Sequence, residues 1–206
     1  MSKYNNSYPR KGLPWGAILV AFAIVGGVGL LLYLSSTSSS TKGRTTGQPV
    51  NDLVEKPMPN VTLKDKDGNS YSLDNLKGKN VVLFFNEGVM CYPACWNQVA
   101  SLGTDPKLNN GNTVSLSVVT DRPDQWQQAM SRMPDLAKAT ILFDQGGVVS
   151  SQLGMLPVPS SMHKGSNPGH TYVVLDKEGV VRYVYDDPNM AINNAIIIQK
   201  IEEFNK

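Results

Sequence analysis

The chain has 206 residues, 41% of them hydrophobic, and a formal net charge of +2 at pH 7. This length allows one domain with a hydrophobic core and further segments outside it. The small net charge and the lack of a basic stripe interleaved with aromatic side chains exclude a nucleic-acid-binding protein. The chain contains two cysteines, which excludes a scaffold held by several disulfides.

An uncharged segment runs from residue 12 to residue 41. Its apolar part, PWGAILVAFAIVGGVGLLLYL at residues 14–34, is long enough as a helix to cross about 30 Å of hydrocarbon. Trp15 and Tyr33 lie near its two ends, where aromatic rings favour the membrane interface. We therefore predict a transmembrane anchor over residues 13–34. A cleaved signal peptide is the alternative, but the apolar run is longer than a typical signal and no clear small-residue cleavage motif follows it.

The basic residues around this segment predict its orientation. Arg10 and Lys11 lie directly before it, whereas Lys42 and Arg44 lie several residues after it. The positive-inside rule then places residues 1–12 in the cytoplasm and the rest of the chain outside. The compartments outside the cytoplasm are oxidising, so a disulfide between the two cysteines would persist there.

Residues 35–49 form the low-complexity segment SSTSSSTKGRTTGQP. A stretch of this composition cannot bury enough apolar surface to fold, so we predict a flexible linker. We expect the folded domain to occupy residues 50–206, and no internal repeat is visible within it.

Strand signals dominate the first part of this domain. Short alternating runs at residues 61–63 and 70–73 flank an Asp-Gly turn, which predicts a β-hairpin. The continuous apolar run VVLFF at residues 81–85 is typical of a central strand buried on both faces. The sequence PACWNQVASLG at residues 93–103 then predicts a helix that begins at its proline and ends at Gly103.

The rest of the domain continues the alternation and then ends in a hairpin and a helix. The expected elements are a strand at 113–120, a helix at 121–133, a strand at 139–144, a short helix at 147–155, strands at 170–176 and 179–187, and a C-terminal helix at 192–206. This order predicts an α/β fold in which helices flank a mostly parallel central sheet.

The two cysteines lie in the segment GVMCYPACWNQ at residues 88–98. Cys91 follows a predicted central strand and precedes a predicted helix, a position where functional groups collect in α/β sheets. The amides and dipole at a helix N-terminus stabilise a thiolate. Cys95 lies about one helical turn later on the same side, and this spacing permits a disulfide. We predict that Cys91 is the nucleophile and Cys95 the resolving thiol; a structural disulfide that closes a very small loop is the alternative.

Three sequence features together resemble one family. They are KPMPNVTLKDKDGNSYSLDNLKGKNVVLFF at residues 56–85, the cysteine pair, and HTYVVLDKEGVVRYVY at residues 170–185. Over residues 52–185 the chain resembles thioredoxin-fold redoxins, the group that includes AhpC/TSA peroxiredoxins, membrane-anchored thiol–disulfide oxidoreductases and Sco proteins. The resemblance implies a thioredoxin-like fold, redox chemistry at Cys91 and Cys95, and no cofactor.

The chain departs from these subgroups at three positions. Its cysteines are spaced C-x-x-x-C, whereas thioredoxins carry C-x-x-C. Gly88 stands where peroxiredoxins carry Thr or Ser, three residues before the peroxidatic cysteine. His170 stands where thioredoxin-like reductases place a cis-proline before the corresponding strand, and Pro168 lies two residues earlier.

The resemblance to Sco proteins implies a second chemistry. Sco proteins are membrane-anchored and hold copper with a C-x-x-x-C pair and a histidine, which Cys91, Cys95 and His170 match. Thiolates and imidazole are suitable copper ligands. The alternative function is therefore a copper metallochaperone or a thiol reductant for cytochrome oxidase assembly. In similar redoxin-domain proteins the histidine accompanies a C-x-x-C pair, so it does not by itself indicate copper. Other soft side chains near these ligands in the sequence are Met90, Met155, Met162 and His163.

Four further residues each have two interpretations. Glu87 is interpreted as a solvated loop residue, with a buried proton shuttle as the alternative. Trp96 is expected to pack the helix on the sheet, or else to form the wall of a substrate groove. Asp121 and Asp124 are interpreted as helix caps, with a supporting layer around the cysteines as the alternative.

The sequence therefore leads to three functional hypotheses. The first is a membrane-tethered, extracytoplasmic, peroxiredoxin-like antioxidant protein or thiol–disulfide oxidoreductase, whose partners are protein thiols, disulfides or small oxidants. The second is the copper protein, and the third is a structural redoxin domain without turnover. Reactivity of Cys91 with turnover would support the first hypothesis, and Cu(I) binding that requires His170 would support the second.

Overall fold

The computed structural model describes residues 49–206. Among these residues, no helix is both long enough and apolar enough to cross a membrane. The predicted cytoplasmic segment at 1–12, the predicted anchor at 13–34 and all but the last residue of the predicted linker at 35–49 lie outside the described residues.

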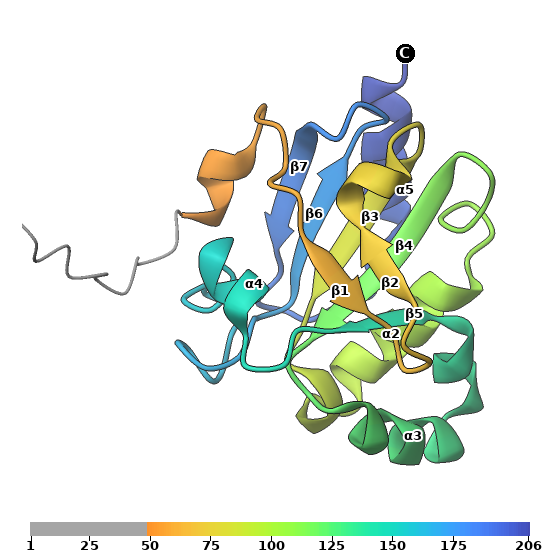
Figure 1. Cartoon of the computed structure of the whole chain (residues 1–206), viewed down its shortest axis with the longest axis vertical. Coiled ribbons are helices and arrows are strands. Elements are labelled where there is room, and N and C mark those ends of the chain that lie inside the picture. Colours follow the sequence, from red (N-terminus) through yellow and green to blue (C-terminus); the bar gives the residue numbers. More distant parts are fainter. Residues whose placement is uncertain (1–48) are drawn as a thin grey trace, which may run out of the picture. The chain divides into compact units, whose positions relative to one another are not determined.

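The described part of the chain forms a seven-stranded β-sheet flanked by helices (Figure 1). Each strand and helix that the sequence predicts from residue 61 onward is present. The strands are β1 (Thr62–Lys64), β2 (Ser70–Ser72), β3 (Asn80–Phe85), β4 (Thr113–Val119), β5 (Thr140–Phe143), β6 (Thr171–Leu175) and β7 (Val181–Asp186). The helices are α2 (Ala94–Thr104), α3 (Pro123–Arg132), α4 (Val148–Gln152) and α5 (Asn194–Phe204), with short 3₁₀-helices η1 (Val50–Leu53), η2 (Leu73–Leu76), η3 (Gly88–Met90) and η4 (Pro134–Lys138).

The sheet is mixed, so the prediction of a mostly parallel sheet was wrong. Its strand order is β2-β1-β5-β4-β3-β6-β7. β3 pairs in parallel with β4, and β4 with β5, whereas the other four pairings are antiparallel. The crossovers through α2 and α3 align only β3, β4 and β5. The hairpins β1–β2 and β6–β7 reverse the chain within each hairpin, and the long connection that follows α4 brings β6 in antiparallel to β3.

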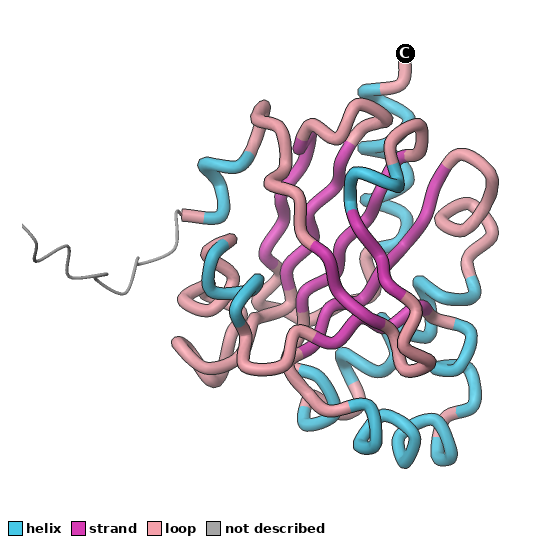
Figure 2. Tube along the Cα trace, in the orientation of Figure 1, coloured by secondary structure: helices cyan, strands magenta, loops and turns pink. Residues whose placement is uncertain are grey.

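β3 is buried on both faces, as its continuous apolar run predicts. Val82 and Phe84 join a hydrophobic cluster with residues of α2, α3 and α5 on one face. Val81, Leu83 and Phe85 join a second cluster, with η1 and the segment after α4, on the other face. Figure 2 shows the strands as an inner layer with helices around it. The cysteine segment follows the carboxyl end of β3 and therefore lies at the edge of the packed core.

Helix α2 differs from its expected bounds at both ends. Pro93 is the N-cap residue, and the helix continues through Gly103 to Thr104. A Cβ on Gly103 would lie 2.5 Å from the backbone nitrogen of Ala139. Gly103 is thus required for close packing against the chain that follows η4, and the prediction that it ends the helix was wrong.

Candidate functional site

Cys91 and Cys95 form a disulfide at the N-terminal end of α2, with their Cα atoms 5.3 Å apart. Cys91 lies between η3 and α2, and its carbonyl accepts a hydrogen bond from the Cys95 amide at 2.9 Å. The two cysteines are one turn apart, as their spacing predicts. Both side chains are buried, with 4% of Cys91 and none of Cys95 exposed. A disulfide is the oxidised form of two cysteine thiols, so this geometry is compatible with a redox pair.

Asp121 supports the turn that leads into Cys91. Its Oδ2 accepts hydrogen bonds from the amide of Val89 at 2.9 Å and from the indole N–H of Trp126 at 2.8 Å. Burial raises the pKa of the Asp121 carboxyl, and these two hydrogen bonds oppose the rise. The carboxylate also fills the space beside Gly88, whose φ of +72° lies in the left-handed region. Asp121 therefore shapes the segment before Cys91, and the prediction that it caps a helix was wrong.

The start of α3 is capped by a different side chain. Gln125 accepts a hydrogen bond from the amide of Arg122 at 2.9 Å through its Oε1. Asp124 instead forms an ion pair with the guanidinium of Arg122 at 2.9 Å on the surface. Neither of the two predicted caps makes a side-chain cap, and of the two only Asp121 contacts the cysteine segment.

His170 faces Cys95 from the start of β6. Its Nδ1 lies 3.7 Å from Cys95 Sγ, and its Nε2 lies 3.1 Å from the carbonyl oxygen of Ala191 and 3.0 Å from the hydroxyl of Tyr172. Burial lowers the pKa of His170, so the ring is neutral near pH 7. A carbonyl only accepts, so we assign the ring proton to Nε2, which leaves the Nδ1 lone pair directed at Cys95. The ring also packs edge-on against Phe84, with centroids 4.6 Å apart.

The loop between β7 and α5 closes the same site from another side. The carboxylate of Asp187 accepts hydrogen bonds from the amides of Asn189 and Ala191 and from the side chain of Asn193. Burial opposes ionisation, but these hydrogen bonds hold the pKa of Asp187 below its ordinary value. This ordered loop places Met190 Sδ 3.8 Å from Cys91 Sγ. Met190 was not predicted from the sequence, because no spacing or motif links it to a cysteine 99 positions away.

Glu87 is buried, so its interpretation as a solvated loop residue was wrong. It is 1% exposed, and its Oε1 accepts hydrogen bonds from the amides of Met162 at 2.6 Å and His163 at 3.1 Å. The His163 ring nitrogen Nδ1 lies 3.2 Å from the same oxygen. Glu87 Oε2 has no hydrogen-bond partner within the described residues. Glu87 thus ties the loop before His170 to the carboxyl end of β3.

Comparison with known proteins agrees with this geometry. The Redoxin family matches residues 53–196, which is most of the chain. The chain belongs to the Redoxin family. It is 32% identical over 155 residues to a chloroplastic peroxiredoxin Q of Populus jackii, covering 75% of this chain and 68% of that protein. It is 33% identical over 129 residues to the chloroplastic peroxiredoxin Q of Triticum aestivum, a match that spans 57% of that protein's length.

More distant relatives extend the likeness to bacteria. The redoxin is 24% identical over 147 residues to peroxiredoxin Bcp of Escherichia coli K12, covering 70% of this chain and 92% of that one. Peroxidoxin BcpB of Mycobacterium tuberculosis superposes with a TM-score of 0.60 at 18% identity, over 74% of this chain and 98% of that one. AhpC of Enterococcus faecalis superposes with a TM-score of 0.63 at 16% identity, over 74% and 92%. These structures show that the redoxin has the thioredoxin-like α/β fold of peroxiredoxins.

The other side chains named as soft neighbours of the cysteines do not converge on them. Met155 is fully buried in the core cluster beside η1, and Met162 is 66% exposed. Met90 is 54% exposed, and its Sδ lies 3.1 Å from the side-chain nitrogen of Asn167. Among residues 49–206, no group of three or more His, Cys, Asp or Glu side chains is arranged to hold a metal ion.

Trp96 packs α2 on the sheet of this redoxin, as predicted. It is 5% exposed, belongs to the larger core cluster and donates its indole N–H to the carbonyl of Val89 at 3.2 Å. The ring of Tyr92 lies edge-on to it with centroids 5.0 Å apart. The buried indole thus holds the turn before Cys91 through its hydrogen bond to Val89.

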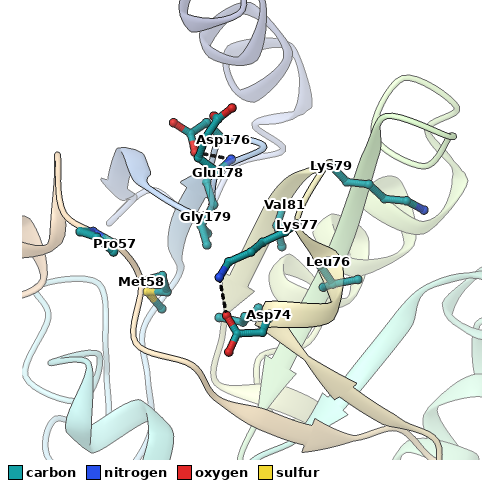
Figure 3. A pocket seen from close by; sticks show the side chains of 12 residues that line it. Pro57, Met58, Asp74, Leu76, Lys77, Lys79, Val81, Asp176, Glu178 and Gly179 are labelled. Atoms are coloured by element: carbon teal, nitrogen blue, oxygen red, sulfur yellow. Dashed lines mark hydrogen bonds and ion pairs between the residues drawn. The ribbon is translucent and has the colours of Figure 1, made fainter.

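A small pocket lies away from the cysteines, near the amino-terminal half of β3 (Figure 3). Its volume is about 70 Å³, and Lys77 and Asp74 form an ion pair across part of it at 2.8 Å. The lining includes Val81 but neither cysteine. No residue of the candidate site described above lines this pocket.

Proposed function

We propose that this redoxin is a thiol-based redox protein that reduces a hydroperoxide with the Cys91–Cys95 pair. The observation that carries the proposal is the buried disulfide at the N-terminal end of α2, with Cα atoms 5.3 Å apart. The names of its relatives, peroxiredoxin Q and peroxiredoxin Bcp, support a hydroperoxide as the oxidant.

The chemistry requires two steps. The Cys91 thiolate attacks the terminal oxygen of the hydroperoxide and the O–O bond breaks. Cys91 becomes a sulfenic acid, and the leaving alkoxide takes a proton from solvent and departs as an alcohol. The Cys95 thiol then loses its proton and its sulfur attacks Cys91 Sγ. The S–O bond breaks and hydroxide leaves with that proton as water, which gives the disulfide seen here. A partner dithiol returns both cysteines to the reduced state, becomes a disulfide itself and restores the cycle.

The surroundings of the two sulfurs support this division of roles. Cys91 lies in the loop before α2, between the exposed residues Met90 and Tyr92. Cys95 is fully buried, and the lone pair of His170 Nδ1 faces its sulfur. In the reduced state this nitrogen accepts a hydrogen bond from the Cys95 thiol and orients it toward Cys91.

Trapping of the sulfenic acid tests the proposal. The reduced full chain, its Cys95→Ser variant and its Cys91→Ser variant are each treated with one equivalent of hydroperoxide and then with dimedone. We expect a dimedone adduct on Cys91 in Cys95→Ser, an intramolecular disulfide in the unmodified chain and no adduct in Cys91→Ser. If a protein disulfide oxidises the pair but hydroperoxide does not, the protein is a thiol–disulfide oxidoreductase. If neither oxidant reacts with the pair, the protein is a structural redoxin domain without turnover, and both the peroxidase and the oxidoreductase functions are excluded.

We further propose that residues 13–34 anchor the protein in a membrane, with residues 1–12 in the cytoplasm, residues 35–49 as the linker and the domain at 50–206 outside. The uncharged apolar run and its flanking basic residues support this arrangement. Membrane fractionation and protease treatment of intact cells test it. Membrane-bound protein whose domain is digested from outside is the expected result, and soluble or protected protein would contradict it.

Copper handling is the second candidate function. The observation that favours it is that Cys95 Sγ lies 3.7 Å from His170 Nδ1, while Met190 Sδ lies 3.8 Å from Cys91 Sγ. Reduction of the disulfide would thus leave two cysteine sulfurs beside an imidazole and a thioether, a ligand set that suits Cu(I) once the thiols lose their protons. Anaerobic Cu(I) titration of the reduced protein against a competing chelator tests it. Tight one-to-one binding that weakens in His170→Ala supports copper handling, and weak binding unchanged in that variant excludes it.

A further inference from the structure

Met190 covers part of the Cys91 sulfur. Its Sδ lies 3.8 Å from Cys91 Sγ, a van der Waals contact that leaves no room for another atom between them. The chain neighbours of Cys91 are open to solvent, because Met90 is 54% and Tyr92 is 67% exposed. Cys91 itself is only 4% exposed. Met190, on the loop between β7 and α5, therefore contributes to the burial of this sulfur.

The backbone at Met190 adopts a conformation that is rare for methionine. Its φ is +52°, in the left-handed region. The Met190 amide donates to the carbonyl of Asp187 at 3.1 Å, and the Asp187 carboxylate holds the amides of Asn189 and Ala191 on either side. These bonds impose the conformation. Glycine or asparagine would adopt it at lower cost, so what methionine adds at this position is its long side chain.

The loop is also tied to the helix that carries Cys95. The amide of Asn193 donates to Oε1 of Gln98 in α2 at 2.7 Å, and Gln98 donates to the side chain of Asn194 at 2.9 Å. Gln98 is fully buried. Buried polar contacts with α2 therefore hold the loop that carries Met190 in place beside the disulfide.

We propose that Met190 is a specificity-determining residue, whose side chain restricts access to the Cys91 sulfur according to the size of the reacting partner. The inference rests on the proposed function, in which this sulfur reacts with a hydroperoxide and later with a partner thiol. In the second reaction a thiolate bonds to Cys91 Sγ, and the Cys91–Cys95 bond breaks with its electron pair on Cys95. The second thiol of the partner then displaces Cys91, and the two thiol protons of the partner pass to the cysteines. A small dithiol passes beside Met190, whereas a large one requires its side chain to move.

The test measures reduction of the disulfide in the full chain, in detergent, by dithiothreitol and by the protein dithiol thioredoxin. The variants are Met190→Gly, which removes the side chain and suits the positive φ, and Met190→Leu, which keeps the bulk without sulfur. Met90→Ala is the matched control, because Met90 neighbours Cys91 in sequence but contacts Asn167. Thermal unfolding of each variant confirms that it is folded.

We expect Met190→Gly to speed reduction by thioredoxin about tenfold, with a much smaller change for dithiothreitol, since a smaller steric barrier favours the larger reagent. Met190→Leu and Met90→Ala should match the unmodified chain with both reagents. Equal acceleration of both reagents in Met190→Gly, or no acceleration, would overturn the inference, as would Met190→Leu behaving like Met190→Gly. The assay starts from the disulfide and needs no hydroperoxide, so its outcome is independent of whether the sulfenic acid forms.

Discussion

The carboxylate of Asp121 occupies the space that a side chain at Gly88 would need. A Cβ on Gly88 would lie 1.8 Å from Oδ2 of Asp121, a distance that no pair of nonbonded atoms can adopt. The same Oδ2 accepts the amide of Val89, so the turn that leads to Cys91 is built around this carboxylate. Glycine at this position, where peroxiredoxins carry Thr or Ser, follows from the contact with Asp121.

Substitution of Gly88 by alanine should therefore destabilise the fold. We expect the free energy of unfolding to fall by about 2–4 kcal/mol, because the change combines a positive φ with a steric clash. Urea unfolding measures the loss. Gly68→Ala is the matched control, since Gly68 has a φ of +83° but nothing within 4 Å of its Cβ position. An equal loss in the two variants would show that the contact with Asp121 has no energetic consequence.

Reduction of the disulfide should lower the free energy of unfolding without unfolding the domain. The loop that it closes spans only residues 91–95, so the chain-entropy relation gives about 2 kcal/mol. We expect a small decrease in the urea midpoint when the reductant is added, with the m-value unchanged. Cys91→Ser should abolish this response to reductant. A loss of cooperative unfolding on reduction would instead indicate that the disulfide has a structural role.

Replacement of Glu87 by alanine should release the loop before His170. The variant leaves the amides of Met162 and His163 without their acceptor, and we expect a loss of about 3 kcal/mol. Glu87→Gln keeps an acceptor and should lose less. Hydrogen exchange should quicken in residues 160–168 in the alanine variant but not in Glu202→Ala, a substitution at an exposed site. Unchanged exchange in that loop would contradict the assignment of Glu87 as its anchor.

The buried ring of His170 should make stability depend on pH. Burial lowers its pKa in the folded state below the ordinary value of 6.5. Below pH 6.5 the unfolded chain therefore binds a proton that the folded protein does not, so stability is complete above this pH and falls as the pH decreases. The slope attributable to His170 is at most about 1.4 kcal/mol per pH unit.

Urea unfolding between pH 5 and pH 8 checks this dependence. His170→Asn should remove this part of the slope. His163→Asn should retain it, because this variant leaves the buried His170 ring in place. A slope that is the same in His170→Asn and in the unmodified chain would assign the pH dependence to other groups.

The strands and helices of the domain were predictable because each depends on a local pattern. The run at residues 81–85 predicts a buried strand, and the spacing of Cys91 and Cys95 predicts a pair one turn apart, as the structure confirms. Trp96 was also assigned correctly to the core, since an apolar ring on the inner side of a helix packs wherever that helix meets the sheet.

The predictions for Gly103 and Glu87 were wrong for a different reason. Gly103 carries a helix-stop signal, yet its role is set by its contact with Ala139. Glu87 carries a charge typical of a solvated loop, yet four groups from residues 161–163 meet its Oε1 in the interior. The residues that contact Gly103 and Glu87 are remote from them in the sequence, so no local pattern indicates either contact.

By itself, the sequence determined the order of the elements, the redoxin resemblance and the cysteine pair, because hydrophobic periodicity and short spacings act within a few residues. Only the tertiary structure decided the directions of the strands, the burial of Glu87 and the approach of Met190 and His170 to the two sulfurs. These features arise from packing between segments that are remote in the chain, where the contact depends on the whole fold.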